Sequence, residues 1–121
     1  MNIAGKTDIG MVRSTNQDTF RIEALGEAAG MALVCDGMGG ARAGDKASAL
    51  ARRHITDVIR ASGFGTMAME EAEIQQLMLS AIHTANSVIY RLSQRELAYT
   101  GMGTTVVLVL FAGQQAYVAH V

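Results

Sequence analysis

The sequence predicts an α+β fold in which two helices cover a mainly antiparallel sheet. Segments with the apolar or alternating pattern of strands flank two amphipathic helical segments within the 121 residues. Because each helical segment has a single apolar stripe, both need a sheet surface to cover. The order of strands, then two helices, then strands favours a layered α+β domain over repeated β-α-β units.

Composition excludes several classes of protein. Half of the residues are hydrophobic and 17% are charged, which suits a folded core rather than a disordered tail. A net charge of −1 without a basic stripe indicates no nucleic-acid partner and no membrane surface, and no apolar run is long enough to cross a bilayer. The single cysteine, Cys35, lies in an apolar segment, so we expect a buried reduced thiol and a cytoplasmic location.

The first elements expected are strands. Ile3–Ile9 mixes apolar and polar residues as a strand does, and the polar segment Gly10–Asp18 is typical of a loop. Thr19–Leu25 alternates between apolar and charged residues, which predicts a half-buried strand. A short turn at Gly26–Gly30 would join it in a hairpin to the apolar strand Met31–Cys35.

Two helices should follow. The first is predicted over Ala43 to about Ala61, with an acidic residue in its first turn, and Ser62–Met69 would connect it to the second. Glu70–Gln94 carries the strongest helical pattern of the chain. The apolar stripes consist of Ala47, Ala51, Ile55, Val58 and Ile59 in the first helix, and Ile74, Leu77, Met78, Ala81, Ile82, Ala85, Val88, Ile89 and Leu92 in the second.

A second hairpin is expected after the helices and a turn at Tyr99–Gly103. Thr104–Phe111 is apolar and rich in β-branched residues, which predicts a strand buried on both faces. Gly113–Gln115 would form a tight turn, and Ala116–Val121 would return as the partner strand. Because a domain rarely ends on an apolar strand, we expect residues 1–121 to be the N-terminal part of a single larger domain. An open edge at 116–121 would favour a strand-swapped dimer.

The segment Met31–Gly44 holds the most informative residue. Asp36 ends an apolar run and enters a cluster of glycines, and a carboxylate there is costly unless it is paired or binds a metal. The cluster is not a nucleotide-binding loop of the G-x-G-x-x-G type, because Arg42 stands where the third glycine belongs. No Gly-Lys-Ser/Thr sequence follows, so the Walker pattern fails too.

A divalent metal would explain Asp36. In the expected hairpin, Asp18 and Asp36 meet at the same end of the sheet, and two such carboxylates suggest a hard cation such as Mg²⁺ or Mn²⁺. The Gly37 carbonyl could add a further oxygen ligand, and Arg13 could bind a phosphate bidentately. The alternative is that the two aspartates only cap turns and that Arg13 is a solvated charge.

Other polar residues suggest no further site. No histidine forms a spaced pair with another His or Cys, so zinc is not expected. We expect Ser48 to pack or to hydrogen-bond in the first helix turn, and Arg52 and Arg53 to form a solvated pair. The histidines set aside in this way are His54, His83 and His120.

Three motifs resemble a known family. Thr7–Asp18 (T-D-I-G-x-x-R-x-x-N-Q-D), Val34–Ser48 (V-C-D-G-M-G-G-x-x-x-G-D-x-A-S) and Gly101–Val107 (G-M-G-T-T-V-V) follow one another in order. Together they resemble the N-terminal motifs of metal-dependent 2C-type serine/threonine protein phosphatases, most closely the bacterial branch. The resemblance covers most of the chain and leaves the second helix as generic sequence.

The resemblance implies an α-β-β-α sandwich, of which this chain would hold a part, and a two-metal Mn²⁺ or Mg²⁺ centre. Asp36 would bridge the metals, Gly37 would bind one through its carbonyl, and Asp18 would bind directly or through water. Arg13 would hold the substrate phosphate, so the implied catalytic residues are Arg13, Asp18 and Asp36. The implied reaction is hydrolysis of phosphoserine or phosphothreonine in protein substrates of a serine/threonine kinase, by a metal-activated water.

The sequence also departs from the family pattern. Gln17 stands where many members have glutamate, and Met38 stands where animal members often have histidine. The family pattern continues into Gly-Asp-Ser-Arg and two later aspartates that complete the metal centre, whereas these residues stop at Val121. The second hypothesis is therefore that the 121 residues alone are an inactive fragment, or a binding and assembly module of the same fold.

Overall fold

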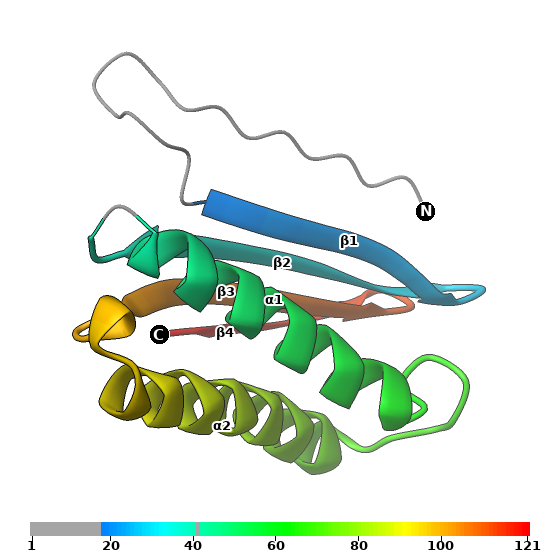
Figure 1. The fold of residues 1–121 in the computed structure, drawn as a ribbon. Helices are drawn as coiled ribbons and strands as arrows, with labels where there is room; N and C mark the ends of the chain where they lie inside the picture. Colours follow the sequence, from blue (N-terminus) through cyan, green and yellow to red (C-terminus); the bar gives the residue numbers. More distant parts are fainter. Residues whose placement is uncertain (1–17, 41) are drawn as a thin grey trace.

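The computed structural model, which describes residues 18–40 and 42–121, confirms the α+β order. One four-stranded sheet has α1 lying across it and α2 packed beside α1 (Figure 1). The predicted strand Ile3–Ile9 and the loop up to Gln17 lie outside the described residues. The elements are β1 (Asp18–Gly26), β2 (Ala29–Met38), α1 (Ala43–Ala61), α2 (Glu71–Arg95), a 3₁₀ helix η1 (Leu97–Tyr99), β3 (Gly103–Ala112) and β4 (Gln115–His120).

The sheet consists of two hairpins joined along β2 and β3. Its strand order is β1-β2-β3-β4, and every neighbouring pair is antiparallel. Both predicted hairpins are confirmed. Gly113 turns the chain between β3 and β4 with a φ of +60°, which a residue with a side chain rarely adopts.

Both predicted helices are confirmed, the first with the expected bounds. The apolar stripe of α1 is buried, with Ala47, Ala51, Ile55 and Ile59 inaccessible to solvent. The second helix begins one residue later than expected, because Glu70 is its N-cap. Glu70 and Glu73 form a capping box that satisfies backbone N–H groups of the first turn.

The core lies between the helices and one face of the sheet. Alternate residues of the two central strands point into it, and all of them are buried: Met31, Leu33 and Cys35 from β2, and Val106, Leu108 and Leu110 from β3. Cys35 is a free thiol, as the sequence predicts, and burial raises its pKa to about 12.

The opposite face of the sheet corrects one prediction. Thr104–Phe111 was expected to be buried on both faces, but β3 is buried on one face only. On the other face Val107 is 43% exposed, and its neighbour Val34 on β2 is 51% exposed. The reason is that no layer among residues 18–40 and 42–121 covers this face, which we call the open face.

Among the strands that the structure describes, β1 is an outermost one, and its charged residues face the helices. Arg21 and Glu23 pair with Leu33 and Met31, whose side chains face the core, so the apolar Ile22 lies on the open face. Charged groups are tolerated there because Arg21 is still 38% exposed and because Glu23 is paired with arginines. Along the described helices, none combines the length and the apolarity needed to cross a membrane.

Candidate active site

Asp18 and Asp36 are directly opposed in the β1–β2 hairpin. Their Cα atoms are register partners at the end of the ladder that lies next to the N-terminus of α1. Directly opposed residues of an antiparallel pair are neighbours across the ladder, so the register sets the two backbone positions side by side. The predicted meeting of these two positions at one end of the sheet is confirmed at the level of the backbone.

A third strand extends this row. Asp36, which is partly exposed, also pairs with Thr105 of β3, whose Oγ1 lies 3.5 Å from the Asp36 carbonyl oxygen and donates to it. The backbone register thus forms one row across three strands, from Asp18 through Asp36 to Thr105. Sequence reasoning did not single out Thr105, although it lies within the G-M-G-T-T-V-V motif.

The strand carrying Asp36 is longer than predicted. β2 continues through Met38, so Asp36 and the buried Gly37 lie within the paired strand rather than beyond its end. The chain then turns into α1 at Gly39, which has a φ of +139°, and the Gly40 carbonyl accepts a hydrogen bond from Ala43 N at 3.0 Å. Strand pairing and a sharp turn together fix where the Asp36–Gly37 backbone lies.

The oxygen groups of Asp36 and Gly37 suit a hard cation such as Mg²⁺ or Mn²⁺, but they make only part of a ligand set. Within the described part of the chain, no three His, Cys, Asp or Glu side chains gather in one place. Arg13 lies outside the described residues, and Asp18 is placed by its backbone. The structure therefore brings together the positions of Asp18, Asp36 and Gly37, and leaves the position of Arg13 open.

The residues set aside behave largely as expected. Ser48 is buried and donates to the Asp45 carbonyl at 3.2 Å within the first turns of α1. Arg53 is exposed, but Arg52 is not the solvated residue that was predicted. Arg52 is half-buried and its Nε is shielded from solvent, because it lies on the side of α1 that faces β1 rather than on the outer side.

The structure thus places the backbone positions of Asp18 and Asp36 side by side at one end of the sheet, next to the glycine turn that leads into α1. The sequence profile of the protein phosphatase 2C family matches residues 11–121. The chain belongs to the protein phosphatase 2C family.

Named relatives are bacterial phosphatases. The chain is 33% identical over 121 residues to a serine/threonine phosphatase of Listeria monocytogenes, covering all of this chain and 47% of that protein. It is 34% identical to protein phosphatase PhpP of Streptococcus pneumoniae, with the same coverage of both chains. The chain thus spans about half the length of the curated relatives that it matches.

Solved structures share the fold. The S. agalactiae serine/threonine phosphatase superposes with a TM-score of 0.79 at 38% identity, covering 95% of this chain and 46% of that one. The Mycobacterium tuberculosis serine/threonine phosphatase PstP/Ppp superposes with a TM-score of 0.72 at 29% identity, covering 96% and 44%. The four strands and two helices described above therefore correspond to about half of a phosphatase of this kind.

Proposed function

We propose that residues 1–121 are the N-terminal part of one phosphatase catalytic domain that hydrolyses phosphoserine and phosphothreonine esters in proteins. The observation that carries the proposal is the direct opposition of Asp18 and Asp36 within the phosphatase 2C fold. Phosphoprotein substrates follow from this chemistry, and serine/threonine kinases are the class of enzyme that must supply them.

Asp18, Asp36 and the Gly37 carbonyl would hold Mn²⁺ or Mg²⁺. When bound, the metal pair supplies an activated water as the nucleophile and Lewis-acid stabilisation of the phosphoryl oxygens. Further ligands would come from the remaining half of the domain.

Arg13 would bind the substrate phosphate. A guanidinium presents two parallel N–H groups to two phosphate oxygens, which orients the phosphorus atom and stabilises the charge that develops during hydrolysis. Met38 has no proton to donate, so protonation of the leaving serine or threonine oxygen would fall to water.

The test is Asp36→Asn in the full-length protein. We expect Mn²⁺-dependent hydrolysis of a phosphoserine peptide to fall by about 100-fold or more. Loss of a residue that only orients a metal ligand can already lower activity by up to about 100-fold, and Asp36 would be a ligand itself. Glu27→Gln, at an exposed glutamate in the turn at the opposite end of the β1–β2 hairpin, is the control and should retain full activity. Unchanged turnover in Asp36→Asn would refute the proposed site.

The second proposal is that the 121-residue piece alone is inactive and associates through β4. In the described residues, β4 is the last strand of the sheet and pairs only with β3. Its other edge offers backbone groups to a further strand, so a second copy could exchange or add residues 116–121. Light scattering should give a dimer for the isolated piece and no phosphatase turnover, whereas an active monomer would contradict both statements.

We also propose a cytoplasmic location. The free thiol of Cys35 fits a reducing compartment. Cell fractionation followed by immunodetection of the full-length protein tests this, and recovery in a membrane or extracellular fraction would contradict it.

A further inference from the structure

A pocket of about 320 Å³ lies between β1 and the exposed edge of α1, and arginines dominate its lining. The lining residues from α1 recur at the spacing of one helical face, so they all lie on the side of α1 that faces β1. We call this site the arginine pocket. Its polar lining consists of Arg21 from β1, and Arg52, Arg53, Thr56, Asp57 and Arg60 from α1.

Three of its polar atoms are buried without a partner. The Nε atoms of Arg21 and Arg52 and the Oγ1 of Thr56 are shielded from solvent and form no hydrogen bond in the described part of the chain. Thr56 is itself only 5% exposed. Buried donors without acceptors cost free energy, so an acceptor in the pocket would remove a penalty that the protein otherwise carries.

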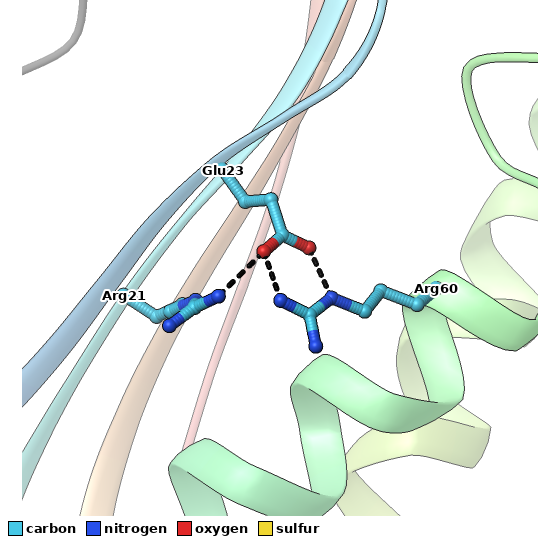
Figure 2. Close-up of polar contacts among 3 residues, drawn as sticks. All are labelled: Arg21, Glu23 and Arg60. Atoms are coloured by element: carbon cyan, nitrogen blue, oxygen red, sulfur yellow. Dashed lines mark hydrogen bonds and ion pairs between the residues drawn. The ribbon is translucent and has the colours of Figure 1, made fainter.

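Two of the arginines are held in place by one carboxylate. Figure 2 shows Glu23 between Arg60 and Arg21, with Arg60 Nε donating to Oε2 at 2.5 Å and Arg21 Nη2 donating to Oε1 at 2.7 Å. Glu23 is largely buried, since 16% of its side chain is exposed. Its contacts restrict the guanidinium groups of Arg21 and Arg60 before any ligand arrives, which lowers the entropy cost of binding.

The other two arginines have no such carboxylate. No ion pair joins Arg52 or Arg53 to an acidic side chain among residues 18–40 and 42–121. Asp57 also lines the pocket, so together with Glu23 two carboxylates face four guanidinium groups. The pocket therefore has excess positive charge in a partly desolvated space, where an anion is favoured.

The arginine pocket is separate from the candidate active site. Arg21 pairs with Leu33 on the side of the sheet that faces the helices. Asp36 lies three residues after Leu33 on β2. Because successive residues of a strand alternate between faces, Asp36 and Leu33 lie on opposite faces of the sheet. Asp36 is thus on the face of the sheet opposite to the arginine pocket.

We infer that the arginine pocket binds a phosphate group at a second site, distinct from the one that would hold the scissile phosphate. Donors reach the pocket from two elements and include a hydroxyl as well as guanidinium groups, which suits the several oxygens of a tetrahedral phosphate better than a planar carboxylate. Inorganic phosphate and a phosphorylated side chain share this chemistry. The inference does not depend on the proposed catalytic function.

The experiment is a calorimetric titration of the full-length protein with inorganic phosphate, in the presence of a chelator so that no metal is bound. We expect saturable binding that weakens by about tenfold in Arg52→Gln, since a charge-assisted bidentate contact is lost. Arg53→Gln, at an exposed position that cannot disturb the core, should weaken binding in the same direction. Thr56→Val, which keeps the shape and removes the hydroxyl, should weaken binding by a smaller factor.

Two control variants separate this site from others. Arg95→Gln, in the last turn of α2, removes one arginine elsewhere on the surface and should leave the affinity unchanged. Arg13→Gln should also leave it unchanged, because Arg13 belongs to the proposed catalytic site. Absence of phosphate binding, equal affinity in Arg52→Gln, Arg53→Gln and the parent protein, or loss of binding in Arg13→Gln alone would overturn the inference.

A second titration distinguishes the sources of phosphate. The metal-free protein is titrated with a phosphoserine peptide and with its unphosphorylated form. Binding of the phosphopeptide that is at least tenfold tighter than that of inorganic phosphate, and that is sensitive to Arg52→Gln, would assign the pocket to phosphorylated proteins. If the phosphopeptide binds no more tightly than inorganic phosphate, the pocket is assigned to free phosphate. If the phosphorylated and unphosphorylated peptides bind equally and Arg52→Gln has no effect on either, the result counts against the pocket.

Discussion

Arg60, in the last turn of α1, forms a two-point contact with Glu23 of β1, 37 residues earlier in the chain. Arg21 adds a third hydrogen bond to the same carboxylate (Figure 2). The hydrogen bond from Arg60 is the largest cause of the lowered pKa of the Glu23 carboxyl group. Together these contacts bring the pKa of Glu23 from 4.5 to about 2, although partial burial acts in the opposite direction.

The lowered pKa predicts a dependence of stability on pH. Because the folded protein holds Glu23 ionised more strongly than the unfolded chain, its contribution is complete above pH 4.5 and is lost as the pH falls toward 2. Thermal unfolding of the full-length protein should therefore give a higher Tm for the parent than for Glu23→Gln at pH 7. That difference should shrink between pH 4.5 and 2.

An exposed glutamate in the turn between β1 and β2 provides the control. Glu27→Gln should change Tm little at any pH, because Glu27 is exposed. A Tm difference between the parent and Glu23→Gln that stays constant down to pH 2 would contradict the assignment of the ion pair.

Gly39 and Gly40 give a matched pair of substitutions at the turn into α1. A Cβ on Gly39 would lie 3.0 Å from the Ala43 Cβ, at a φ of +139° that side chains rarely adopt, whereas a Cβ on Gly40 would meet nothing within 4 Å. Gly39→Ala should destabilise the protein by about 1–3 kcal/mol, as expected for a residue forced into that conformation. Gly40→Ala should be nearly neutral in urea unfolding, and equal losses for both variants would show that the turn relaxes.

Local sequence pattern predicted most of the fold. The bounds of α1 follow from apolar residues that recur every three to four positions, as on one face of a helix. The pairing of Asp18 with Asp36 follows from the short turn that joins their two strands. Both features depend on residues that are close in sequence, so contacts between distant segments have little influence on them.

Features that depend on distant segments could not be predicted in this way. The alternation within Thr19–Leu25 predicts only that its charged residues share one face of a half-buried strand, whereas in the structure Arg60 reaches Glu23 from the end of α1. Arg52 looked solvated because nothing local shows which side of α1 faces β1. The exposure of Val107 depends on whether another layer covers that face of β3. The pattern of the strand shows that the residue is apolar but not whether anything covers it.

Cys35 should be unreactive in the folded protein. It is inaccessible to solvent and burial raises its pKa to about 12, although the nearby charge of Arg52 opposes the shift. Since the thiolate is the reactive form, alkylation by iodoacetamide at pH 8 should leave the peptide containing Cys35 unmodified, and denaturant should make it reactive. Mass spectrometry of the digested full-length protein measures this, and rapid alkylation under native conditions would contradict the described core.

Val107 tests whether the open face is covered in the complete domain. The phosphatase 2C sandwich would place a second sheet against this face, so a side chain that is 43% exposed here would be buried there. In the full-length protein, Val107→Glu would then bury an unpaired charge and should cost about 3 kcal/mol in urea unfolding. Leu97→Glu, at a position that is 92% exposed, is the control and should stay within about 0.5 kcal/mol of the parent. If the two variants behave alike, the open face remains in contact with solvent in the complete protein, and the proposal that residues 1–121 are one half of a layered catalytic domain fails.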